Sequence, residues 1–145
     1  MQKGGVKSLV RGKVDFNAKR IDRMQSVEEL GAMLFPGNRT HQRVFLAIFI
    51  EIKYAERGFL PALNPLCNKY GFSPRMLETV RSKMRRLGTI DHISRFSKTH
   101  GYKDGWVLST RFSHSLTRLA ELAENFKERE GPLQERKDRD LFRYL

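Results

Sequence analysis

The segment spanning residues 60–87 constrains the fold more than any other part of this sequence, because signals that end one helix and start another lie close together in it. Gly71 favours the left-handed backbone conformation that ends a helix. Ser73 is suited to cap the next helix, and Pro74 occupies its first position, where a missing N–H does no harm. The pattern predicts two helices joined by a short turn, a helix-turn-helix, with the second helix over 74–87.

The second helix has two opposed faces. At ~100° per residue, an apolar stripe of Leu77, Val80, Met84 and Leu87 falls within ~80° of arc. The opposite stripe contains Arg75, Thr79, Ser82 and Arg86, and it is flanked by Lys83 and Arg85. An ordinary solvated face would mix in acids for i,i+4 pairing, but here Glu78 is the single acid among five cations. This imbalance favours a face that binds a polyanion over one that is merely solvated.

The neighbouring segments predict an α+β, mostly helical chain. Residues 40–57 have helical periodicity, and residues 89–97 and 106–112 predict a β-hairpin with a loop of about eight residues between them. The start of the first helix of the helix-turn-helix stays open between Pro61 and Pro65, because proline resists helix interiors.

This order of elements resembles the winged helix-turn-helix family. The resemblance covers roughly residues 40–126, and its strongest parts are LCNKYGFSPRMLETVRSKMRRLG and the hairpin that follows. It implies that helix 74–87 is the recognition helix and that loop 98–105 is the wing. The prolines in the first helix of the motif depart from the usual family pattern.

Basic side chains occur in the predicted wing as well as in the predicted recognition helix. The predicted wing carries Lys98, His100 and Lys103 around Tyr102, with Arg95 at its base. Such a loop suits phosphate or minor-groove contact, although a solvated turn is the alternative. The predicted DNA-binding residues are Arg75, Thr79, Ser82, Lys83, Arg85, Arg86, Arg95, Lys98 and Lys103.

The overall charge agrees with a nucleic-acid partner. The chain has 28 Lys and Arg against 16 Asp and Glu, a formal net charge of +12. Strongly basic proteins bind nucleic acid more often than other partners, although acidic proteins and lipid headgroups are alternatives. Residues 1–25 are rich in cations and glycine, which predicts a flexible basic arm or a tail that only adds solubility.

Other functional classes have little support. The histidines are scattered, the single Cys67 excludes an intramolecular disulfide, and we find no constellation of catalytic or metal-ligating residues. We therefore expect no enzymatic activity, no metal and no cofactor. The longest apolar run, residues 44–50, is far shorter than the roughly 20 residues of a membrane span, so we expect a cytoplasmic, nucleoid-associated protein without a membrane partner.

The predicted domain organisation is an arm (1–25), a winged domain (26–112), a C-terminal helix (113–130) and a charged tail (131–145). The C-terminal helix has a coiled-coil-like apolar seam over 114–130, which predicts a homodimer or packing on the chain's own domain. The functional hypothesis is a sequence-specific binder of double-stranded DNA, most simply a transcriptional regulator. A replication-initiation or partition protein of a mobile element, or an RNA-binding or ribosome-associated factor, is the alternative.

Overall fold

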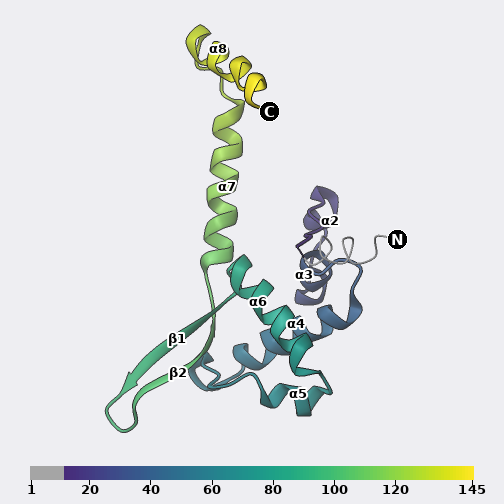
Figure 1. Cartoon of the computed structure of the whole chain (residues 1–145), viewed down its shortest axis with the longest axis vertical. Coiled ribbons are helices and arrows are strands. Elements are labelled where there is room, and N and C mark those ends of the chain that lie inside the picture. Colours follow the sequence, from purple (N-terminus) through teal and green to yellow (C-terminus); the bar gives the residue numbers. More distant parts are fainter. Residues whose placement is uncertain (1–11) are drawn as a thin grey trace. The chain divides into compact units, whose positions relative to one another are not determined.

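The computed structural model describes residues 12–145, which divide into two compact units at the boundary between Thr110 and Arg111 (Figure 1). In its described part the chain is α+β and mostly helical, with one two-stranded sheet. The first unit contains α2 (Ala18–Asp22), α3 (Val27–Leu34), α4 (Arg39–Lys53), the 3-10 turn η1 (Glu56–Gly58), α5 (Pro65–Tyr70), α6 (Pro74–Leu87), β1 (Ile90–Ser97) and β2 (Gly101–Leu108). The second contains α7 (Arg111–Lys127), α8 (Pro132–Asp140) and the 3-10 turn η2 (Leu141–Tyr144).

The turn between α5 and α6 has the predicted boundaries. Gly71 ends α5 with a left-handed backbone at φ 75°. The hydroxyl of Ser73 then accepts a hydrogen bond from the backbone N–H of Met76 at 3.1 Å, which caps α6. The open choice at the start of the motif is resolved, because α5 begins at Pro65 and leaves Pro61 outside the helix.

The core of the first unit forms where α6 and the hairpin pack on α4. In α4 the side chains of Val44, Phe45, Ile48 and Ile52 are fully buried. From α6 the core receives Leu77, Val80 and Met84, and from the hairpin it receives Ile90 and Trp106. Each helix thus contributes one apolar stripe, as its periodicity requires. The opposite face of α6 is left at the surface.

The hairpin has a shorter turn than the sequence suggested. Ser97 pairs with Gly101, so the connection is only residues 98–100, and residues 101–105 of the predicted wing loop belong to β2. Gly105 is therefore not a turn residue. A Cβ atom at this position would collide with the Phe59 ring, so the glycine allows that ring to lie against the strand.

A short extended segment joins the hairpin at its base. Leu60 and Trp106 exchange backbone hydrogen bonds, with the Leu60 N–H donating at 2.9 Å and the Trp106 N–H at 2.8 Å. Trp106 is buried. This pairing anchors the base of the hairpin to the chain that leads into α5.

The predicted basic arm lies partly outside the described residues, which start at residue 12. Within its described part, α2 is capped by the side chain of Asn17, which accepts from the Arg20 N–H at 3.1 Å. The Asp15 N–H donates to the Met33 carbonyl at 2.8 Å, so this segment contacts the end of α3.

The second unit consists of helices without buried side chains. Helix α7 starts three residues before the predicted seam and carries exposed Leu116, Leu119 and Phe126. Residues 131–145, which we predicted to be a charged tail, contain α8. Across residues 12–145, no helix has both the length and the hydropathy needed to cross a membrane.

Candidate nucleic-acid interface

The outward face of α6 presents most of the cations that the sequence placed there. Arg75, Arg85 and Arg86 are exposed, and so is Ser82. The backbone of the helix is held by the buried stripe on its other side, so these side chains project from a rigid support. Arginine suits such a position, because its planar group donates in pairs to guanine edges and to phosphates.

A carboxylate that the sequence reading left unassigned organises this face. Glu78 accepts hydrogen bonds from Arg81 and, at 3.2 Å, from the hydroxyl of Ser82. The hydrogen bond from Arg81 lowers the pKa of Glu78. Thr79 is half-buried, and its hydroxyl donates to the carbonyl of Arg75 at 3.0 Å. The i+3 and i+4 spacings from Glu78 to Arg81 and Ser82 are the signal that would have revealed this network.

Lys83 does not belong to the outward face, which corrects its place among the predicted contacts. Its side chain is only 6% exposed, and its ammonium donates to the backbone carbonyl of Lys13 at 2.6 Å. The same ammonium lies 4.6 Å from the centre of the Phe35 ring. Burial lowers the pKa of Lys83 to about 8, and the charge of Arg86 acts in the same direction. Its angular position places Lys83 at the edge of the polar stripe of α6. The contact with the Lys13 segment directs its side chain to the buried side.

The basic residues of the hairpin lie on one face of it. Arg95 and Lys103 are cross-strand partners, so their side chains share a face. Arg95 turns toward the base, where it donates to the Arg57 carbonyl at 3.4 Å and lies 5.0 Å from the centre of the Phe59 ring. Lys98 is exposed in the turn. Of the three predicted hairpin contacts, Lys98 and Lys103 are therefore the better placed for a phosphate.

The other face of the hairpin carries an aromatic pair. Phe96 and Tyr102 are also cross-strand partners, and their ring centres are 5.2 Å apart. The two side chains are 64% and 78% exposed. Sequence reasoning noticed Tyr102 but missed Phe96, because the pairing partner follows only from the three-residue turn.

A cleft of about 250 Å³ separates α6 from the base of the hairpin. The hairpin lines it with His92 and Trp106, and α6 lines it with Glu78, Arg81 and Arg85. The Arg81 guanidinium lies 5.3 Å from the centre of the Trp106 ring. The centres of the His92 and Trp106 rings are 4.6 Å apart. The cleft shows which face of the hairpin adjoins the cationic helix.

A charged cluster ties α5 to α4. Glu51 accepts hydrogen bonds from the Lys69 ammonium at 2.7 Å and from the Tyr70 hydroxyl at 2.5 Å. The hydrogen bond from Lys69 is the main cause that lowers the pKa of Glu51, followed by the one from Tyr70. The bond to Glu51 also raises the pKa of Tyr70. This cluster helps to set the position of the turn from which α6 starts.

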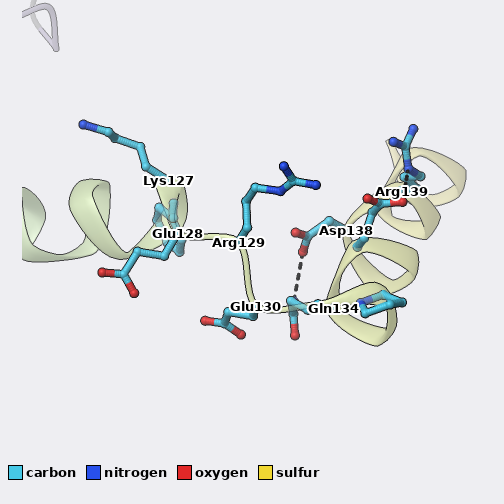
Figure 2. Close-up of a pocket in the computed structure, with 11 residues that line it drawn as sticks. Lys127, Glu128, Arg129, Glu130, Gln134, Asp138 and Arg139 are labelled. Atoms are coloured by element: carbon cyan, nitrogen blue, oxygen red, sulfur yellow. Dashed lines mark hydrogen bonds and ion pairs between the residues drawn. The ribbon is translucent and has the colours of Figure 1, made fainter.

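A second hollow, of about 570 Å³, lies between α7 and α8. Figure 2 shows both cationic and anionic side chains along this hollow, and Lys127 points away from α8. The polar side chains pair locally: the Gln134 amide donates to the Asp138 carboxylate at 2.9 Å, and Arg139 forms an ion pair with Glu135 at 3.4 Å. This arrangement does not direct one kind of charge at a ligand.

Neither the metal-ligating side chains of the described residues nor a comparison with known proteins indicates another site. Among residues 12–145, no group of three or more His, Cys, Asp or Glu side chains is placed to hold a metal ion. No protein-family model, curated protein or solved structure matches this chain.

Proposed function

We propose that this protein binds double-stranded DNA sequence-specifically as a winged helix-turn-helix transcriptional regulator, with α6 as its recognition helix and the β1–β2 hairpin as its wing. One observation carries the proposal. Helix α6 buries its apolar stripe against α4 while it presents Arg75, Arg85 and Arg86 on the opposite, exposed face. A recognition helix needs this combination of a fixed backbone and outward donors.

The contacts divide into two kinds. Arg75 and Arg86 lie on the outermost stripe of α6, where a guanidinium has the reach and geometry to read a guanine. Lys98 and Lys103 lie on the hairpin, where point charges suit phosphates and carry no sequence information. Specificity is therefore assigned to α6, and the salt-dependent part of the affinity is shared with the wing.

Binding of duplex DNA by charge variants tests the proposal. With fragments selected from a genomic library at physiological salt, Arg75→Ala and Arg86→Ala should each weaken specific binding by roughly 1–3 kcal/mol where the side chain meets a base. The Lys98→Ala/Lys103→Ala variant should weaken binding to all sequences and reduce the salt slope by about two units.

Arg136→Ala is the matched control, because it removes the same charge from an exposed position in α8. Its affinity should equal that of the wild type. Equal affinities for all variants would refute the proposed interface. Preferential competition by structured RNA would refute the DNA assignment, and retention of tandem repeats would favour the role in replication or partition.

A homodimer through the seam of 114–130 is part of the same proposal. Four residues of this seam fall within ~80° of arc on α7: Leu116, Leu119, Ala123 and Phe126. The first ten residues of α7 contain Arg111 and Arg118 and no acid, whereas its remaining seven contain Glu121 and Glu124 together with Lys127. Two copies in antiparallel register would cover the apolar seam and bring these opposite charges together.

Sedimentation analysis tests the dimer. Leu119→Ser/Phe126→Ser should convert it to monomer, whereas Leu133→Ser, an exposed apolar position in α8, should leave the mass unchanged. A wild-type chain that is monomeric at high micromolar concentration would disprove this part of the proposal.

A further inference from the structure

We infer that Phe96 and Tyr102 form an aromatic wedge that inserts between base pairs in the minor groove of duplex DNA and bends it. The inference rests on the proposed function, because α6 must first hold the duplex beside the hairpin. It assigns a separate task to two side chains that are not needed for recognition by α6.

The exposure of the pair is unexplained by folding. Phe96 and Tyr102 leave 64% and 78% of their surface in solvent, at the end of the hairpin farthest from the core. Their ring centres are 5.2 Å apart with the planes inclined by 58°, so the two rings form one protruding apolar unit. Proteins that kink DNA through the minor groove use apolar side chains of this kind as wedges.

The fold determines which face of the hairpin a bound duplex would meet. Side chains alternate along a strand, so Phe96 shares a face with His92, and Tyr102 shares it with Trp106. His92 and Trp106 line the cleft against α6, together with Arg81 and Arg85. The aromatic pair therefore lies on the face that adjoins the cationic helix, about 13 Å farther along the strand than Trp106.

The opposite face is less suited to this role. Phe59 covers it at Gly105, and Arg95 is held there by the Arg57 carbonyl. Two exposed cations lie at the same end of the hairpin as the aromatic pair: Lys98 in the turn, and Lys103 on the face that carries Arg95. A duplex phosphate backbone complements these charges, which favours duplex DNA over an uncharged apolar partner.

Bending of a labelled duplex tests the wedge. The probe is an A·T-rich duplex of about 30 base pairs with central TA steps, which kink easily, and with a fluorescence donor and acceptor at its ends. At saturation the wild type should raise energy transfer, as expected for a kink of about 20–90°. Phe96→Ala/Tyr102→Ala should bind roughly tenfold more weakly and leave energy transfer at the level of free DNA.

The chain offers a matched control away from the hairpin. Phe16 and Tyr54 are 65% and 75% exposed, so Phe16→Ala/Tyr54→Ala removes the same aromatic area elsewhere. This control should bend the duplex as the wild type does. Tyr102→Ala alone should reduce bending partially, which provides a second measurement if the double variant unfolds.

The outcomes separate the wedge from the proposed function. A wild type that does not bind duplex DNA overturns both. Binding without bending, equal bending by the wing double variant, loss of bending in the control, or tighter binding of the corresponding single strand overturns the wedge. When the wild type does bind duplex DNA, the recognition role of α6 is tested separately by Arg75→Ala and Arg86→Ala.

Discussion

Helices α6 and α7 have similar sequence patterns and different surroundings. Each has an apolar stripe at helical spacing, but Leu77, Val80 and Met84 of α6 are buried, whereas Leu119 and Phe126 of α7 are exposed. Their polar faces differ as well, because α6 concentrates cations and α7 alternates charges in local pairs such as Lys127 with Glu124. Periodicity therefore determines which face of a helix is apolar, while the partner of that face depends on the rest of the chain.

Truncation of one apolar side chain in each helix should reveal the difference in burial with the largest effect. Met84→Ala removes a fully buried side chain and should lower the free energy of unfolding by about 2–5 kcal/mol. Leu119→Ala, measured at protein concentrations that keep the chain monomeric, should change it by less than about 0.5 kcal/mol. Urea denaturation of the two variants gives both values, and similar losses would contradict the difference in burial.

The pH dependence of Lys83→Met sharpens the description of α6. Because the folded-state pKa of Lys83 is lowered to about 8 from 10.5, the unfolded state binds more protons between these values. The wild type should therefore gain roughly 1–3 kcal/mol of stability relative to the variant as the pH rises through this window. The neutral amine can still donate to the Lys13 carbonyl, so this contact survives the titration.

Arg75→Met is the control on the exposed face of α6, because Arg75 does not act on the pKa of Lys83. Its stability difference from the wild type should not depend on pH between 8 and 10.5, and it should weaken duplex binding where Lys83→Met does not. Urea denaturation at pH 7 and 9.5 gives the free energy of unfolding of Lys83→Met relative to the wild type. A difference that is the same at both pH values would show that the Lys83 ammonium is in solvent.

The smallest expected effect concerns the carboxylate that ties α5 to α4. Glu51→Gln should lower the free energy of unfolding by about 0.5–1 kcal/mol at pH 7, because Lys69 is largely exposed and its charge is screened. The pKa of Glu51 is lowered from 4.5 in the folded state, so the wild type loses this advantage as the pH falls below 4.5.

Glu124→Gln in α7 provides the comparison for this ion pair. Glu124 pairs with Lys127 at 3.3 Å, and both side chains are exposed, so its loss should have no measurable effect on thermal unfolding. Equal effects of the two substitutions at pH 7, or a Glu51→Gln difference that persists well below pH 4.5, would show that the α4–α5 cluster contributes nothing specific.

Local signals predicted the helices and their boundaries around the turn. Gly71 and Ser73 act through their own backbone and neighbouring N–H groups, so their effect is readable without knowledge of the fold. The hairpin was predicted from its β-branched and aromatic residues, but its turn was placed wrongly. Gly105 resembles a turn residue in sequence, whereas its actual role is to accommodate Phe59 from another segment.

The candidate interface was predicted only in part for the same reason. Angular position on α6 correctly separated Arg75 and Arg86 from the apolar stripe, because helical geometry is local. The direction of Lys83 depended on Lys13, which lies far away in sequence, and the partnership of Phe96 with Tyr102 depended on the register of the hairpin. The periodicity of the sequence carries no information about these contacts.

The charge of +12, the boundaries of the helix-turn-helix and the opposed faces of α6 all follow from the sequence. Each of these follows from composition or from interactions within a few residues. Tertiary contacts were needed to place Lys83 in the interior and the aromatic pair on the α6 side of the hairpin. Those features arise from contacts between segments distant in sequence, where packing and desolvation select the partner of each side chain.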